Sequence, residues 1–265
     1  MTTGVRPLNP AGTALSAIPL WSPVEPAAVP SVDAAQMAEV DRAMFEDYGI
    51  VLVQMMEHAG RHLAHLARAR FLAGDARGRP VVVLAGKGGN GGGALVAARR
   101  LAGWGADVSI AVTADDEAFV PASRLQLGIA RRLDLPVVRA ADLGRLARPD
   151  LIIDGVIGYR LHGAPGGEAA RLIAWAAAAA APILALDIPS GLDATTGMPG
   201  DPVIEAAATM TLALPKRGLS VDTARRYVGE LYLADIGVPP ALYARAPLGL
   251  VVPPVFAACD LVRLR

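Results

Sequence analysis

The sequence predicts an α/β fold with a Rossmann-like, doubly wound and mainly parallel sheet, covered by helices on both faces in three layers. Short apolar runs alternate with longer segments of helical periodicity, which is typical of βαβ crossovers. A glycine-rich turn at residues 86–93 follows the first of these apolar runs. Hydrophobic residues make up 53% of the 265-residue chain, enough to bury a sizeable core.

Two helices are expected before the sheet begins. Ser31 and Asp33 offer N-caps for a helix over residues 34–46, whose apolar residues recur at helical spacing. A second helix is predicted over residues 50–72, because its apolar residues share one face, and Gly74 and Gly78 follow it.

From Pro80 onward, strands and helices are expected to alternate. The apolar run at 81–85 predicts a buried parallel strand, and the glycine-rich turn then opens a helix over 91–103. Further short apolar runs predict strands over residues 107–113, 136–139, 151–154, 183–187, 207–214 and 230–234. Helical spacing predicts crossover helices over 122–133 and 168–180.

This pattern divides the chain into three parts. Residues 1–30 form a proline-rich N-terminal arm, either packed on the domain or a partner subunit or loosely ordered. Residues 31–245 form the α/β domain, and residues 246–265 form a C-terminal tail laid over its surface. Prolines interrupt the first thirty residues, so they do not match a secretory signal.

Composition and charge exclude several classes of protein. Lys plus Arg and Asp plus Glu are 25 each, so the formal net charge is zero and a basic nucleic-acid or membrane binder is not expected. The single cysteine, Cys259, excludes an internal disulfide and a cysteine-based zinc site. No apolar run reaches the length of a membrane span, and we expect a cytoplasmic protein.

The glycine-rich turn reads GKGGNGGG and contains G-x-G-x-x-G between a predicted strand and a predicted helix. In this context glycines let the backbone approach a pyrophosphate, and the helix N-terminus receives its charge. A tight turn without a ligand is the alternative. A P-loop is excluded because no Gly-Lys-Ser/Thr closes the turn. The amide oxygen of Asn90 suits a cation or a ribose hydroxyl.

Two carboxylates are predicted at the carboxyl ends of neighbouring strands, where ligands of such sheets bind. Asp154 follows an apolar run, and Asp187 ends the run before Ile188-Pro189-Ser190-Gly191. Each could cap a turn. Together they could bind a cation, or supply one acid/base and one ion ligand.

A series of motifs resembles the NAD(P)H-hydrate epimerase family, the YjeF N-terminal domain family. The resemblance covers about residues 31–243, and its most specific motif is DIPSGLDATTG at 187–197. The others are MMEHAG at 55–60, VVVLAGKGGNGGGALVAARRL at 81–101, DGVIG at 154–158, PKRGL at 215–219 and ADIGVP at 234–239.

The resemblance implies a stand-alone isomerase that interconverts the R and S epimers of NADHX and NADPHX in nicotinamide nucleotide repair. It implies Asp187 as the catalytic acid/base, and one potassium ion per subunit held by Asn90, Asp154 and Ser190. A homodimer is implied, and a separate dehydratase could act on the product. The substrate-binding residues would be Gly89, Asn90, Gly91, Gly92, Gly93, Gly158, Tyr159, Arg160, Leu161, His162, Gly163, Ala164 and Asp187.

The chain departs from the family pattern at several positions. Gly89 and Gly93 stand where the family has Asn and Asp, and Tyr159-Arg160 replaces Thr-Gly. The alternative function is therefore a catalytically impaired domain that binds a ligand or acts as a scaffold. Arg160 either pairs with a phosphate or extends along the surface.

Five further residues have side chains that could take part in a site. His58, His62 and His65 have helical spacing, but nothing in the sequence completes a metal site, so they are interpreted as a partly exposed helix face. His162 is either a proton donor or a plain loop residue. Lys216 is a weak candidate for contacting a phosphate.

Overall fold

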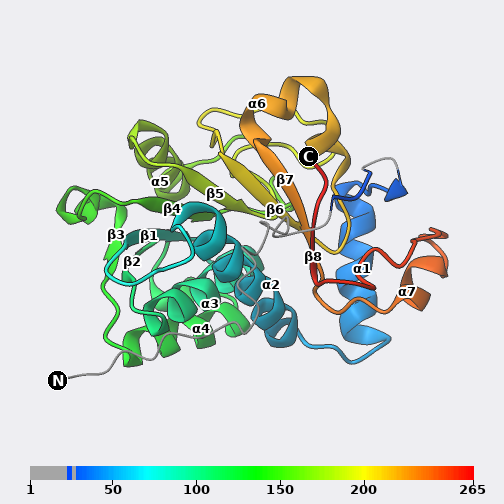
Figure 1. Cartoon of the computed structure of the whole chain (residues 1–265), viewed down its shortest axis with the longest axis horizontal. Helices are drawn as coiled ribbons and strands as arrows, with labels where there is room; N and C mark the ends of the chain where they lie inside the picture. Colours follow the sequence, from blue (N-terminus) through cyan, green and yellow to red (C-terminus); the bar gives the residue numbers. More distant parts are fainter. Residues whose placement is uncertain (1–22, 26–27) are drawn as a thin grey trace, which may run out of the picture.

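A computed structural model describes residues 23–25 and 28–265, and in this part of the chain all strands join one sheet (Figure 1). The strand order is β3-β2-β1-β4-β5-β6-β7-β8, and every pair is parallel except β7 with β8. The bounds are β1 (Pro80–Ala85), β2 (Asp107–Val112), β3 (Val137–Arg139), β4 (Leu151–Gly155), β5 (Ile183–Leu186), β6 (Ala208–Leu212), β7 (Glu230–Ala234) and β8 (Leu261–Arg263). The order reverses between β1 and β4, which is where doubly wound sheets bind ligands.

Helices cover both faces of the sheet. The α-helices are α1 (Ala34–Glu46), α2 (Leu52–Leu66), α3 (Gly89–Gly103), α4 (Pro121–Arg132), α5 (Gly167–Ala178), α6 (Arg225–Val228) and α7 (Pro240–Ala244). Figure 1 shows α3 and α4 on one face and α5 on the other. One buried apolar cluster joins α2, α3 and α4 to the sheet, and another joins α5 to its opposite face. The predicted three-layer fold is confirmed.

The two N-terminal helices begin for local reasons. At α1, the Asp33 side chain accepts the Gln36 N–H at 2.8 Å, and the Gln36 side chain accepts the Asp33 N–H at 3.1 Å. This capping box fixes the first turn. The helix expected over 50–72 is shorter, because α2 ends at Leu66 and the chain continues as a π-helical turn, Ala67–Phe71.

The segment predicted as a C-terminal tail contributes a strand. β8 pairs antiparallel with β7, and Val24 donates its N–H to the Arg263 carbonyl at 2.9 Å. Residues 1–22 and 26–27 of the predicted N-terminal arm lie outside the described residues. None of the described helices has the length and apolarity needed to cross a membrane.

Glycines bring β1, β4 and α3 into close contact beside the switch point. A Cβ at Gly86 would overlap the Val156 carbonyl oxygen, and one at Gly91 would overlap the Gly86 carbonyl oxygen. Gly155 is as confined, because a Cβ there would overlap Ala94. Much of the glycine pattern is therefore required by packing, while Gly89 has ordinary space around it.

This packing predicts opposite outcomes for two similar substitutions. Gly91→Ala should lower the free energy of unfolding by about 1–3 kcal/mol or more, because the added methyl group meets fixed backbone. Gly89→Ala should change it by less than about 1 kcal/mol, because its Cβ would lie 3.7 Å from the flexible Leu52 side chain. Urea unfolding of both variants provides the measurement, and equal losses would contradict the packing argument.

Candidate functional site

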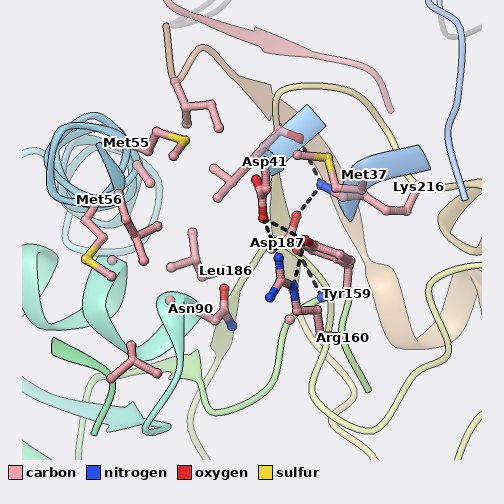
Figure 2. A pocket seen from close by; sticks show the side chains of 18 residues that line it. Met37, Asp41, Met55, Met56, Asn90, Tyr159, Arg160, Leu186, Asp187 and Lys216 are labelled. Carbon is pink, nitrogen blue, oxygen red and sulfur yellow. Dashed lines mark hydrogen bonds and ion pairs between the residues drawn. The ribbon is translucent and has the colours of Figure 1, made fainter. Parts of the chain in front are cut away.

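A cavity of about 280 Å³ lies over the carboxyl ends of the central strands (Figure 2). One side is apolar and is formed largely by Leu52, Met55 and Met56 of α2, with Leu186 at the end of β5. The other side carries polar and charged groups from α1 and from the loops that follow β4, β5 and β6. The cavity thus combines an apolar wall with a few oriented polar groups, as small-molecule sites do.

Asp187 lies at the centre of the polar side. It follows β5 in a left-handed conformation, with φ 68°, and its N–H donates to the Met210 carbonyl at 2.7 Å. Left-handed backbone is uncommon outside glycine, although aspartate adopts it more readily than most residues. This turn directs the buried carboxylate toward the cavity. Its Oδ2 accepts the Tyr159 N–H at 3.2 Å, and its Oδ1 contacts Lys216 and Thr211.

Lys216 forms a buried ion pair with Asp187. Its side chain is fully buried, and its ammonium group donates to Asp187 Oδ1, to the Leu212 carbonyl at 2.8 Å and to Thr211 Oγ1 at 3.3 Å. The sequence suggested that Lys216 contacts a phosphate. In the structure its ammonium group is instead turned inward, toward Asp187. Lys216 instead contributes to the wall of the cavity next to Asp187.

Asp154 and Ser190 meet below the cavity. The Asp154 carboxylate accepts the Ser190 O–H at 2.6 Å, the Ser190 N–H at 2.8 Å and the Val156 N–H at 3.2 Å. These donors are all neutral, and burial raises the pKa of Asp154 to about 6. Ser190 Oγ also accepts the Ile157 N–H at 2.8 Å, which ties the loop after β4 to the loop after β5.

Asn90 reaches the same loop from the first turn of α3. A Cβ at Gly158 would lie 3.3 Å from Asn90 Oδ1 and 3.1 Å from Asp187 Oδ2, so the absence of a side chain at Gly158 lets these groups converge. The Asn90 Nδ2 is buried, and within the described chain it has no hydrogen-bond partner. An unpartnered buried donor lining a cavity is suited to a ligand acceptor.

Tyr159, Arg160 and Asp41 form a second polar cluster at the cavity (Figure 2). The Tyr159 hydroxyl donates to Asp41 Oδ2 at 2.6 Å and accepts from Arg160 Nε at 2.8 Å. Arg160 also pairs with Asp41 at 3.3 Å while its own side chain remains 67% exposed. Burial raises the pKa of Asp41 and of Tyr159 above their ordinary values. This cluster joins α1 to the loop after β4.

Some of the predicted substrate-binding residues line the cavity and others do not. Gly89, Gly93 and Gly158 line the cavity with Asn90, Tyr159, Arg160 and Asp187. Gly91 and Gly92 are buried below it in α3 and are not part of its lining. Leu161, His162, Gly163 and Ala164 also lie outside the lining, and His162 is exposed.

The three α2 histidines do not form a metal site. His58 and His62 stack with ring centroids 6.5 Å apart, whereas His65 contacts Trp104. Across the described residues, no group of three His, Cys, Asp or Glu side chains could hold a metal ion. His62 is buried rather than partly exposed, and burial lowers its pKa.

Two residues of the site were not predicted from the sequence in the roles found here. Asp41 was not predicted at all, and Lys216 was not predicted as the partner of Asp187. Asp41 lies one helical turn after Met37, on the stripe of α1 that also buries Val40 and Met44. An acidic residue on a buried stripe is the signal that could have found it. Lys216 follows an apolar strand, in the motif Pro215-Lys216-Arg217-Gly218, but its burial depends on contacts between segments that are distant in the sequence.

Comparisons with known proteins find relatives that match most of this chain. The family model described as YjeF-related protein N-terminus matches residues 52–218. The chain is 40% identical over 247 residues to an NAD(P)H-hydrate epimerase of Dehalogenimonas lykanthroporepellens, covering 92% of this chain and 96% of that one. It is 34% identical to a bifunctional NAD(P)H-hydrate repair enzyme of Moorella thermoacetica, of which it covers 41%.

A solved structure supports the fold. The crystal structure of the yeast protein YNL200c superposes with a TM-score of 0.76 at 22% sequence identity, over 89% of this chain and all of that one. This likeness shows that the two proteins share the fold.

The burial of Asp154 predicts a pH dependence of stability. Its pKa is about 6 in the native state and 3.8 ordinarily. Between these two pH values the native protein therefore retains a proton that the unfolded chain has released. The free energy of unfolding should therefore fall by about 3 kcal/mol as the pH rises from about 4 to about 6. Asp154→Asn should lack this fall. Urea unfolding across this range in tetramethylammonium buffer measures it, and parallel curves for both proteins would contradict it.

Proposed function

We propose that this chain, which belongs to the YjeF-related protein N-terminus family, is an NAD(P)H-hydrate epimerase acting on the R and S epimers of NADHX and NADPHX. One observation carries the proposal. The aspartate of the most specific motif, Asp187, pairs with Lys216 and presents its carboxylate to a partly apolar cavity over the carboxyl ends of the central strands. A relative named for this activity is 40% identical over nearly its whole length.

The reaction needs an acid/base beside one ring carbon. The hydrated carbon carries a hydroxyl next to the ring nitrogen. When its C–O bond breaks, the electron pair leaves with the oxygen, a proton joins it to give water, and the nitrogen lone pair forms a planar iminium. Addition of water to the other face forms a new C–O bond and releases a proton. The atoms and electrons balance without an oxidant or reductant.

Asp187 suits both halves of this reaction. During water addition its carboxylate accepts the proton that the water loses, and in the reverse direction it returns that proton to the departing hydroxyl. Its negative charge also stabilises the iminium cation between the two steps. The apolar wall from α2 and Leu186 would contact the ring and limit access of bulk water.

We further propose a potassium ion held by Asn90, Asp154 and Ser190. The residues fit this ion chemically, because all three offer the oxygen ligands that hard cations prefer. Asp154 is fully buried and accepts only neutral donors among the described residues, so a cation would compensate its charge. The ion would connect the loops after β1, β4 and β5, and it would add positive charge for an anionic substrate.

Two partners are also proposed. The bifunctional relatives include a further region that this chain does not cover, since it matches 41% of the Moorella protein. As a second partner we propose a dehydratase that acts on the epimerised product. A homodimer remains a prediction, supported by Phe45 and Val51, which are 60% and 43% exposed on either side of the α1–α2 turn.

Replacement of Asp187 provides the direct test of the proposed function. Asp187→Asn preserves size and removes the titrating group, so epimer exchange should fall by about 10²–10⁴-fold. Exchange of purified NADHX epimers above the spontaneous background is measured by NMR or chromatography.

Asp193→Asn is the matched control from the same loop. Asp193 caps Thr195 and Thr196 and does not line the cavity, so this variant should retain wild-type exchange. Equal activity of Asp187→Asn and the wild type would exclude Asp187 as the acid/base. Absence of exchange in the wild type would overturn the proposed function.

Potassium should stabilise the folded protein. At constant ionic strength, replacing tetramethylammonium with potassium should raise the melting temperature, because the ion binds the native state. Asp154→Ala should abolish this rise, and Ser190→Ala should reduce it. The melting temperature is followed by circular dichroism across a potassium titration. An unchanged response in Asp154→Ala would count against the site.

A further inference from the structure

We propose that Lys216 is a positioning residue that holds the Asp187 carboxylate in one orientation, with Oδ2 as the oxygen presented to the substrate. This inference rests on the proposed function and assigns a role to a residue outside the expected site. The evidence is the arrangement of donors and acceptors around the two side chains.

The Lys216 ammonium group is held on three sides. Its three acceptors are Asp187 Oδ1, Thr211 Oγ1 and the Leu212 carbonyl, which match the three N–H groups of an ammonium. The backbone is held as well, because Val32 donates its N–H to the Pro215 carbonyl and accepts the Arg217 N–H, each at 2.9 Å. With no exposed surface, Lys216 has little freedom to turn away from Asp187.

The two oxygens of Asp187 consequently differ. Oδ1 faces Lys216 and Thr211 and is occupied by them. Oδ2 accepts the Tyr159 N–H at 3.2 Å and lies where a Cβ at Gly158 would approach it at 3.1 Å, on the side of Asn90. Turning the carboxylate plane away from this orientation would break the ion pair, so one oxygen faces Lys216 while the other stays beside Tyr159 and Asn90, and we infer that this second oxygen is the one presented to the substrate.

Lys216 is the counter-ion of Asp187, because the other charged groups at the cavity pair with each other. Asp41 on α1 and Arg160 on the loop after β4 also line the cavity, and they pair with each other and with the Tyr159 hydroxyl. Within the described chain, Lys216 is the cation that contacts Asp187. Its loss would leave a buried carboxylate free to rotate and without charge compensation.

The test separates positioning from substrate binding. Lys216→Met preserves length and removes the charge, so kcat for epimer exchange should fall about 10²-fold while KM stays within about threefold. Lys216→Ala with added ethylammonium should recover activity in proportion to its concentration. Tetramethylammonium, which has no N–H donor, should not restore activity.

A double variant controls for misfolding. In the Asp187→Asn background, Lys216→Met should cause no further loss of kcat, because Lys216 acts through Asp187. The uncharged double variant should also melt at a higher temperature than Lys216→Met alone, because it carries no unpaired buried charge.

Specific outcomes would overturn the inference. An undiminished kcat in Lys216→Met, a rise in KM alone, or an additive loss in the double variant would each exclude positioning through Asp187, while wild-type exchange would still support the proposed function. Absence of exchange in the wild type would overturn the proposed function and this role together.

Discussion

The buried ion pair between Asp187 and Lys216 is the constraint on which the site depends. Asp187 directly follows β5, and Lys216 lies in the loop after the neighbouring parallel strand β6. The segment before α1 fixes the Lys216 backbone. Breaking a buried pair by removing one partner costs about 3–5 kcal/mol in other proteins. The residues that shape the site are therefore also residues that stabilise the contact between the sheet and the N-terminal segment.

Around this pair, the cavity has a polar side and an apolar side. The carboxyl ends of β1, β4 and β5 supply polar groups whose positions follow from the parallel sheet, and α2 supplies the methionines and leucine opposite them (Figure 2). Gly93 belongs to the apolar side, since a Cβ there would lie 3.0 Å from Leu186. The departure from the family pattern at this position therefore leaves an apolar wall while Asn90, Asp154, Ser190 and Asp187 remain.

The sequence predicted the sheet well because apolar runs and glycine-rich turns are local signals, and it placed Asp154 and Asp187 correctly at strand ends. It could not predict the left-handed turn at Asp187, which depends on a hydrogen bond to Met210 on a neighbouring strand. Nor could it find the Lys216 pairing, which joins segments far apart in the chain. β8 was missed because three residues, Leu261–Arg263, are too short for a pattern of their own.

The far edge of the sheet has a consequence for how this protein behaves at high concentration. A parallel strand such as β7, left bare, would offer a row of backbone donors and acceptors to another chain. Here β8 occupies that row, and Pro23, which has no N–H, is bridged to Arg263 on the outer side of β8. A further strand therefore cannot pair with β7 while β8 is in place, and removing the last residues would leave the β7 edge open to pairing with another chain.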